Sequence, residues 1–156
     1  GTVGSQEKIE IAKKYGCDEV INYSKEDFAK KVMELTDGKG VSVVYDGVGK
    51  STYDKSIECL KLRGTMVSFG NASGALDPII VSKSLQPKGI YFVRPAMNQY
   101  FTNSEEIHEA ANMLFKQISS GNVKIEIYKK YKLEDAVQAH RDLEGRKITG
   151  PAVIIP

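Results

Sequence analysis

The sequence has few of the features that mark several common protein classes. It contains two cysteines, Cys17 and Cys59, without a Cys-x-x-Cys spacing, so neither a disulfide framework nor a thiol redox motif is expected. No apolar run approaches the roughly 18 residues of a membrane span, and no signal peptide is visible. The 22 basic and 20 acidic side chains nearly cancel, which gives no support to a nucleic-acid or membrane partner. These absences favour a cytoplasmic protein with reduced cysteines.

The signature motifs of several enzyme classes are also absent. There is no G-x-G-x-x-G between a strand and a helix, no Walker A sequence, no H-E-x-x-H and no G-x-S-x-G. His108 and His140 lie on predicted helices, and neither has a Cys, Asp or Glu at metal-ligand spacing. His140 falls on the apolar stripe of its helix, where a packed side chain is expected rather than a catalytic base. We therefore expect no metal site, and no residue is assigned as a catalytic acid or base.

What the sequence does contain is an alternation of strand-like and helix-like segments over 156 residues. Helices are predicted over residues 6–15, 24–38, 51–60, 103–121 and 133–143, and strands over 19–23, 41–49, 64–70, 90–95, 123–131 and 151–156. Gly16 is expected to cap the first helix, and Ser24 with Asp27 has the spacing of a capping box at the second. This alternation predicts an α/β fold with a doubly wound, mostly parallel sheet.

The ends of four predicted strands carry glycine and polar residues. They read "GTVGS" at residues 1–5, "DGVG" at 46–49, "FGNASG" at 69–74 and "VRPAM" at 93–97. A glycine after a strand is often only a turn residue, so no single one of these is diagnostic. Ligands of parallel α/β sheets bind at the carboxyl ends of the strands, so together the four ends predict a shared cleft.

The same stretches resemble a known family. Residues 1–23, 43–74, 88–95 and 131–156 are similar to zinc-free, zeta-crystallin-like quinone oxidoreductases of the medium-chain dehydrogenase/reductase superfamily. The resemblance implies hydride transfer from NADPH to a quinone or a related electrophilic carbonyl compound. It also implies a homodimer that pairs through the edge strand "GIYFVRP" of the Rossmann domain.

The resemblance further implies that the chain is a C-terminal fragment. Residues 1–122 would form a partial NADP-binding Rossmann domain, and residues 123–156 a tail that returns toward an absent catalytic domain. The first strand, the glycine-rich phosphate loop and the following helix would be missing. In the strand order 3-2-1-4-5-6 that strand lies in the middle of the sheet. The fragment alone is therefore predicted to bind nucleotide poorly and to be inactive.

The resemblance also implies which residues meet the cofactor, and it implies none that is catalytic. Around the adenosine ribose and its phosphate it places Gly1, Ser5, Lys8 and Tyr23, and near the cofactor Gly49. Beside the nicotinamide half it places Phe69, Gly70, Asn71 and Ser73, and the wall continues with Phe92, Val93 and Arg94. Other interpretations stay open, since Lys8 is also a plausible solvated helix lysine, Tyr23 a packing residue and Asp46 a turn cap.

The resemblance and the first strand end together predict NADP(H) as the cofactor. An NAD-binding Rossmann domain usually has a carboxylate at the end of its second strand, whereas "GTVGS" has no acid before Glu7. Two other functions stay open. One is a nucleotide-binding or interaction module without turnover, and the other is an unrelated α/β module such as a methyltransferase. The residues encoded before Gly1 would distinguish the enzyme from the module.

Overall fold

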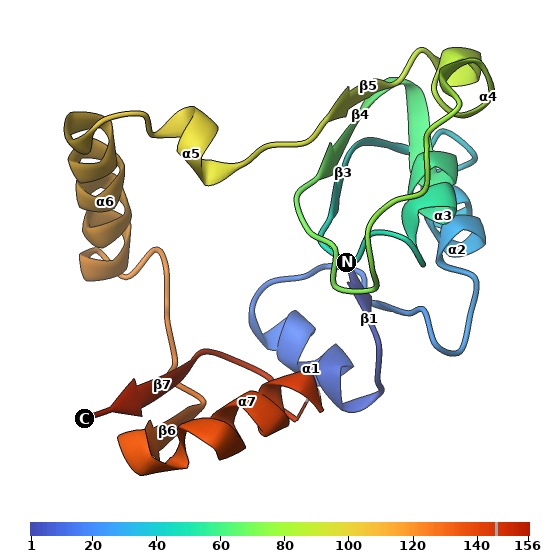
Figure 1. Cartoon of the computed structure of the whole chain (residues 1–156). Helices are drawn as coiled ribbons and strands as arrows, with labels where there is room; N and C mark the ends of the chain where they lie inside the picture. Colours follow the sequence, from blue (N-terminus) through green and yellow to red (C-terminus); the bar gives the residue numbers. More distant parts are fainter. Residues whose placement is uncertain (146) are drawn as a thin grey trace. The chain divides into compact units, whose positions relative to one another are not determined.

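The computed structural model describes residues 1–145 and 147–156. It divides into two compact units, Gly1–Tyr100 and Phe101–Pro156, which are drawn in Figure 1 and described here one at a time. The domain boundary predicted at residue 122 came from the family resemblance and stays a prediction. None of the described helices is long and apolar enough to cross a membrane.

The first unit alternates strands and helices, as the sequence predicts. Its elements are β1 (Thr2–Val3), α1 (Glu7–Lys14), β2 (Ile21–Asn22), α2 (Phe28–Leu35), β3 (Val41–Asp46), α3 (Tyr53–Cys59), β4 (Leu60–Ser68), α4 (Val81–Ser84), the 3₁₀ helix η1 (Gln86–Lys88), β5 (Tyr91–Val93) and α5 (Met97–Tyr100). β1 pairs with β2, and β3, β4 and β5 pair in that order, all in parallel. The predicted parallel α/β fold class is confirmed.

The strands of this unit do not form one continuous sheet. Sheet β1-β2 and sheet β3-β4-β5 are separate, so β1 and β3 each pair on one side only within the described residues. In the doubly wound order 3-2-1-4-5-6, the strands equivalent to β1 and β3 are the two neighbours of strand 1. The sheet is therefore interrupted at the position where the family resemblance implies a missing strand.

Helix ends in this unit follow local hydrogen-bonding rules, with one departure from the prediction. Gly16 has a positive φ of 90° after α1, as expected of a glycine cap. At α2 the cap is Asp27, whose Oδ1 accepts from the amides of Ala29 at 3.0 Å and Lys30 at 3.2 Å. The capping box predicted from Ser24 is wrong, because the Ser24 hydroxyl donates instead to the Gly4 carbonyl at 2.8 Å.

Two clusters of buried side chains form the core of the first unit. One contains Ile21, Phe28, Ala29 and Cys59, and the other contains Ile57, Leu60, Met66 and Ile90. Val41 and Val44 on β3 pack against both clusters, so the core is continuous between the two sheets. Helices α2 and α3 lie against each other and contribute Phe28, Ala29, Ile57 and Cys59 to the two clusters. Packing thus holds the two sheets in one unit although no ladder joins them.

The second unit contains a long helix and a small parallel strand pair. Its elements are α6 (Ser104–Ser119), β6 (Lys129–Lys132), the 3₁₀ helix η2 (Leu133–Asp135), α7 (Ala136–Glu144) and β7 (Ala152–Ile155). Asn103 caps α6 by accepting from the Glu106 amide at 3.0 Å, as the sequence predicts. The strand predicted over residues 123–131 is shorter than expected, because only Lys129–Lys132 pairs with β7.

The face that α7 buries is not the face predicted from its apolar stripe. His140 is exposed, and so are Leu133, Val137 and Leu143. The buried residues of the helix are Ala139 and Asp142. Asp142 occupies the inner face because Tyr131, Lys129 and Gln138 all donate hydrogen bonds to its carboxylate. The packed role predicted for His140 is therefore wrong.

Candidate functional site

The carboxyl ends of β1 and β2 bring together several of the predicted cofactor residues. Gly4 lies so close to Tyr23 that a Cβ added at Gly4 would come within 2.7 Å of the Tyr23 hydroxyl oxygen. The Tyr23 amide donates to the Val3 carbonyl at 3.1 Å, which fixes the start of that side chain. Ser5 follows Gly4 in the same loop and is half-buried. Lys8 lies in the first turn of α1 and is also half-buried.

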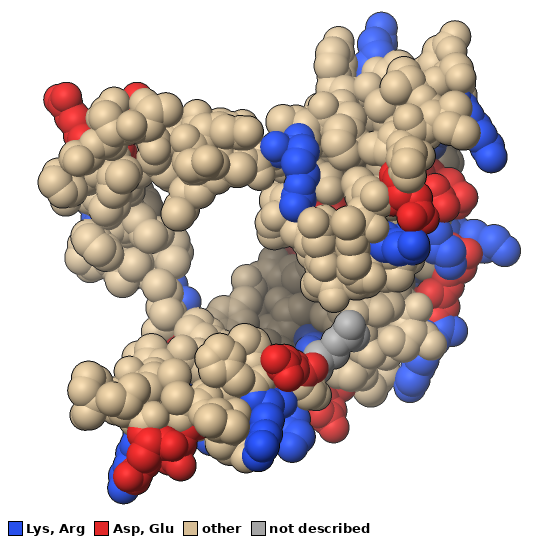
Figure 2. All heavy atoms as spheres, in the orientation of Figure 1, with Lys and Arg blue, Asp and Glu red and all other residues tan. Residues whose placement is uncertain are grey.

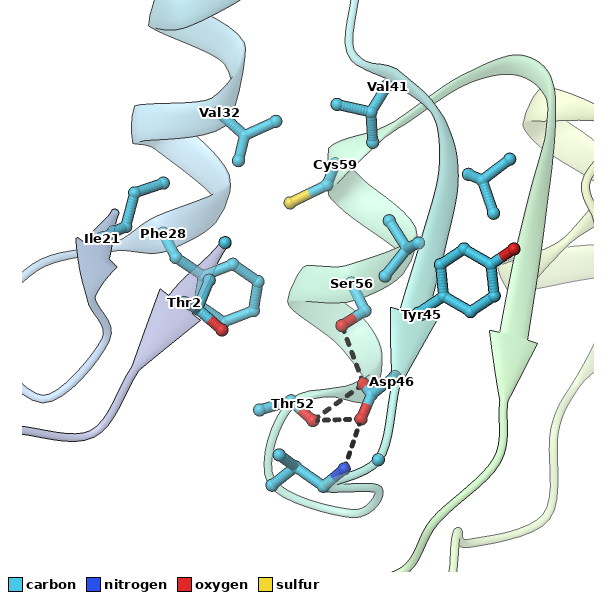
Figure 3. Close-up of a pocket in the computed structure, with 15 residues that line it drawn as sticks. Thr2, Ile21, Phe28, Val32, Val41, Tyr45, Asp46, Thr52, Ser56 and Cys59 are labelled. Carbon is cyan, nitrogen blue, oxygen red and sulfur yellow. Dashed lines mark hydrogen bonds between the residues drawn. The ribbon is translucent and has the colours of Figure 1, made fainter. Parts of the chain in front are cut away.

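A second group of residues lies after β3 and is organised by Asp46. This carboxylate is 5% exposed. It accepts from the amides of Val48 at 2.8 Å and Gly49 at 2.9 Å. It also accepts from the hydroxyls of Thr52 at 2.8 Å and Ser56 at 2.8 Å, as Figure 3 shows. Burial raises the pKa of Asp46, but the hydrogen bonds from Gly49, Ser56, Thr52 and Val48 outweigh it and leave the pKa below its usual value.

The loop after β3 is bonded to the loop after β4; residues 47–50 and 70–74 are called the paired loops below. The Val48 carbonyl accepts from the Ser73 amide at 2.7 Å and from the Ser73 hydroxyl at 2.8 Å. The same hydroxyl accepts from the Ser51 amide at 2.9 Å. Ser73, predicted to line the cofactor cleft, therefore has its hydroxyl engaged in joining the two loops.

Glycines allow the paired loops to approach each other. A Cβ added at Gly70 would lie 2.3 Å from the Gly47 carbonyl oxygen, which no side chain tolerates. At Gly49 the φ is +90°, and an added Cβ would lie 2.8 Å from the Gly74 carbonyl oxygen. Gly49 and Gly70, which the resemblance implies as cofactor contacts, are thus required for loop packing, and this requirement is independent of any ligand.

The remaining predicted residues differ in where their side chains lie. Phe69 is 55% exposed and rests beside Gly47, and Asn71 is also exposed. Val93 is 37% exposed. Phe92 instead packs its ring edge-on against Tyr53, with 6.3 Å between ring centroids. Arg94 Nη1 donates to the Ser68 carbonyl at 2.6 Å and so ties the end of β5 to the end of β4.

A cavity of about 350 Å³ lies between β1 and β3. Figure 3 shows Thr2 and Phe28 on one side and Tyr45 and Asp46 on the other. The lining is largely apolar, and Gly1 is the one predicted cofactor residue in it. The facing edges of both strands are unpaired, so this cavity, called the slot below, marks the break between the two sheets.

Neither the cysteines nor clustered acids indicate other chemistry in the part of the chain that is described. Both thiols are free, and burial raises the pKa of Cys59 to about 11, which keeps it protonated. No group of three or more His, Cys, Asp or Glu side chains within the described residues could hold a metal ion. On the drawn face of each unit, basic and acidic side chains lie among one another rather than in a patch of one sign (Figure 2).

The sequence pattern predicts Asp46 as a residue of one of the four strand ends or as a turn cap, and it does not single out Thr52 and Ser56. A usable signal was present, because Thr52 and Ser56 are four positions apart and so lie on one face of a helix. Two hydroxyls on that face, following a strand that ends in Asp, indicate a buried carboxylate with side-chain donors. The partnership of residues 47–50 with residues 70–74 had no comparable local signal.

Comparison with known proteins gives a consistent result. A family model described as zinc-binding dehydrogenase matches residues 15–154. A 2-haloacrylate reductase from Burkholderia sp. is 44% identical over 157 residues, which cover 100% of this chain and 47% of that protein. Quinone oxidoreductase 1 of Escherichia coli K12 is 44% identical over 158 residues, covering 100% of this chain and 48% of that protein.

Solved structures agree with the sequence comparison. The crystal structure of Escherichia coli quinone oxidoreductase complexed with NADPH superposes with a TM-score of 0.95 at 44% identity, covering 100% of this chain and 48% of that one. The chain thus spans about half the length of the relatives it matches. The predicted resemblance to quinone oxidoreductases is confirmed, and the chain belongs to the zinc-binding dehydrogenase family.

Proposed function

We propose that this chain is the cofactor-binding part of an NADPH-dependent reductase that transfers a hydride to a quinone or a related electrophilic carbonyl compound. The observation that carries the proposal is the close approach of Gly4 to Tyr23 at the ends of β1 and β2, with Ser5 next in the same loop and Lys8 in the first turn of α1. The likeness to a quinone oxidoreductase complexed with NADPH supports it. The alternative, a nucleotide-binding or interaction module without turnover, shares the same site and differs only in activity.

The residues present fit a nucleotide that carries a 2′-phosphate. No carboxylate lies between Thr2 and Gln6, so the negative charge of a 2′-phosphate would meet no repulsion from that loop. Gly4 leaves only backbone beside the Tyr23 hydroxyl, and a larger residue there would require the Tyr23 ring to move. The Lys8 ammonium, the Ser5 hydroxyl and the Tyr23 hydroxyl would hold the phosphate, and hydrogen bonds to charged groups are about twice as strong as neutral ones.

The paired loops would line the nicotinamide half of the cofactor. When bound, the nicotinamide supplies the hydride, and the protein supplies position and exclusion of water. Phe69 and Val93 present exposed apolar surface at the ends of β4 and β5, where they would cover a flat aromatic ring. Asn71 and Arg94 would contribute polar contacts beside them. No residue of the chain is assigned as a catalytic acid or base, and the zinc-free chemistry implied by the family resemblance stays part of the proposal.

We propose further that the chain alone binds the cofactor weakly and does not turn over. The slot between β1 and β3 leaves Tyr45 74% exposed and Val43 40% exposed on a strand whose composition suits burial on both faces. Homodimer formation through β5 also belongs to the proposal. It is supported by the position of β5 at the end of its sheet, with Tyr91 65% exposed.

The proposal is tested by replacing Lys8 with alanine in the full-length reductase of which this chain is proposed to be a part, and titrating NADPH and NADH. Loss of a hydrogen bond to a charged group costs roughly 1.5–3 kcal/mol, so NADPH should bind about ten- to a hundredfold more weakly. NADH affinity should barely change, because NADH has no 2′-phosphate. Lys13→Ala, in the last turn of the same helix, is the matched control and should leave both affinities unchanged.

The two titrations also separate the other outcomes. An equal loss for both cofactors would show that Lys8 acts through the structure of α1. An unchanged NADPH affinity would show that Lys8 is only a solvated lysine.

A further inference from the structure

The most informative polar group outside the predicted cofactor contacts is the buried carboxylate of Asp46. All four of its hydrogen-bond donors are electrically neutral: two amides and two hydroxyls. Burying a carboxylate without a paired cation is costly unless its oxygens are fully hydrogen-bonded. The donors around Asp46, which include the Thr52 and Ser56 hydroxyls, therefore form a site specialised for holding a carboxylate.

The four donors lie within residues 48–56 and come from both the loop after β3 and the start of α3. Val48 and Gly49 lie in the first of the paired loops, Thr52 precedes α3, and Ser56 lies within that helix. A simple turn cap would account for the two amides. It would not account for two hydroxyls at the helix, nor for the near-complete burial of the carboxylate. Asp46 therefore fixes loop 47–50 against α3 as well as closing a turn.

The fixed loop in turn holds the second loop. Val48, whose amide donates to Asp46, offers its carbonyl to both the amide and the hydroxyl of Ser73. The Ala72 amide donates to the Gly47 carbonyl at 3.3 Å, on the other side of the same contact. Loop 70–74 is thus bonded to the one segment that Asp46 holds in place, while Phe69 and Asn71 stay exposed beside it.

We propose that Asp46 is the positioning residue of the nicotinamide side of the cleft. It orders loop 47–50 directly and loop 70–74 through Val48 and Ser73, so that both loops present one fixed surface to the cofactor. The choice of ligand in this inference rests on the function proposed above. The coupling of the two loops does not, because it is a property of the chain itself.

The test compares Asp46→Asn with Asp142→Asn in the complete 156-residue chain. Both aspartates are buried, at 5% and 7% exposure, but they lie in different units. Asparagine keeps the size of the side chain and loses the charge and one acceptor oxygen. Amide hydrogen exchange should become at least tenfold faster in Asp46→Asn at Val48 and Gly49 and also at Ala72 and Ser73, and should stay unchanged there in Asp142→Asn.

Cofactor titration supplies a second readout, which is read together with amide exchange in the rest of the first unit, because a loss of folding would speed exchange there as well. Asp46→Asn should weaken NADPH and NADH binding by the same factor, at least tenfold, because both cofactors share the nicotinamide half. Lys8→Ala should weaken NADPH alone, so the failure of one idea is distinguishable from the failure of the other. Faster exchange confined to Val48 and Gly49 would overturn the positioning role and leave a local cap.

A second variant guards against loss of folding. If Asp46→Asn exchanges rapidly throughout the chain, Thr52→Val removes one hydroxyl donor at nearly constant shape. It should speed exchange by severalfold in both paired loops and leave the rest of the first unit protected. Unchanged exchange in loop 70–74 of Thr52→Val would contradict the proposal, as would unchanged NADPH and NADH affinity of folded Asp46→Asn when the unmodified chain binds both.

Discussion

Two buried aspartates in the two units solve the same physical problem with different partners. Asp46 is satisfied by two backbone amides and two hydroxyls. Asp142 accepts from the Tyr131 hydroxyl at 2.8 Å, the Gln138 side-chain amide at 2.8 Å and the Lys129 ammonium at 3.1 Å. The Lys147 ammonium forms an ion pair with the same carboxylate at 3.7 Å. One network fixes backbone loops, whereas the other joins side chains of a strand and a helix.

The difference in partners changes what each carboxylate can do. At Asp142, hydrogen bonds from Tyr131, Lys129 and Gln138 lower the pKa to about 2. At Asp46, burial opposes the lowering and the amides and hydroxyls have to overcome it. A carboxylate tied to amides orders the main chain around it, and this suits a ligand-binding loop. A carboxylate bonded to lysine and tyrosine side chains holds a strand and a helix together, which suits a structural role.

Replacing Gly70 with alanine should have the largest effect on stability, and the effect should be confined to the paired loops around Asp46. The added Cβ would lie 2.3 Å from the Gly47 carbonyl oxygen, so the paired loops must separate. Overpacking of this kind costs roughly 1–3 kcal/mol of folding stability. Hydrogen exchange should accelerate at Ala72 and Ser73, and NADPH affinity should fall.

Gly38→Ala is the matched control for that variant. Gly38 has a φ of +75° with no atom within 4 Å of an added Cβ, so the variant carries backbone strain without a clash. Its cost of roughly 1–2 kcal/mol is comparable, but the paired loops should keep their protection. If both variants loosen the paired loops equally, the close approach of Gly70 to Gly47 is not what holds them.

Acid should weaken the Asp142 region in a defined pH window. The unfolded pKa of an aspartate is about 3.9 and the folded pKa of Asp142 is about 2. The depressed pKa therefore contributes stability that is fully present above about pH 4 and is lost as the pH falls toward 2. The Tyr131 ring signal, followed by NMR from pH 5 to pH 2, should report this loss.

The difference between the unmodified chain and Asp142→Asn isolates this contribution from the other carboxylates. The variant should be less stable at pH 6 and should show a flatter decline below pH 4. Parallel declines in the two proteins would mean that Asp142 does not control the acid response of the second unit.

Ser56→Ala should have the smallest effect of the set. It removes one hydroxyl from Asp46 and leaves the donors Val48, Gly49 and Thr52 in place. The expected loss is roughly 1 kcal/mol of unfolding free energy, measured by urea titration. Ser119→Ala removes an exposed hydroxyl that donates to the Lys116 carbonyl, and its effect should be near zero. Equal effects at the two serines would argue against the specialised role of the Asp46 network.

Much of the fold was predictable because the first unit follows local rules. Continuous apolar runs gave β3 and β4, and glycines such as Gly16 marked a helix end. The errors arose where tertiary contacts decided between two local options. Asp27 displaced Ser24 as a cap because the Ser24 hydroxyl bonds to Gly4, twenty positions away. On α7 Asp142 lies on the buried face in place of the apolar stripe, because donors on β6 and α7 compensate its charge.

The candidate site was predictable to a similar degree. Strand ends located the residues, since the carboxyl ends of parallel strands share one edge of a sheet. The bond between Val48 and Ser73 joins positions 25 apart, and no local pattern encodes such a pairing. For the same reason Phe92 could not be assigned to the core, because its partner Tyr53 lies on a helix remote in sequence.

The neutral partners of Asp46 also determine how the paired loops respond to ionic strength. Mobile ions screen exposed charges over a Debye length of about 8 Å at physiological salt, but they have little to act on where a buried carboxylate meets amides and hydroxyls. The lysines around Asp142 are partly exposed and are open to such screening. A rise in ionic strength would therefore weaken the ion pairs of Asp142 first, and the geometry of the paired loops would stay independent of the salt concentration.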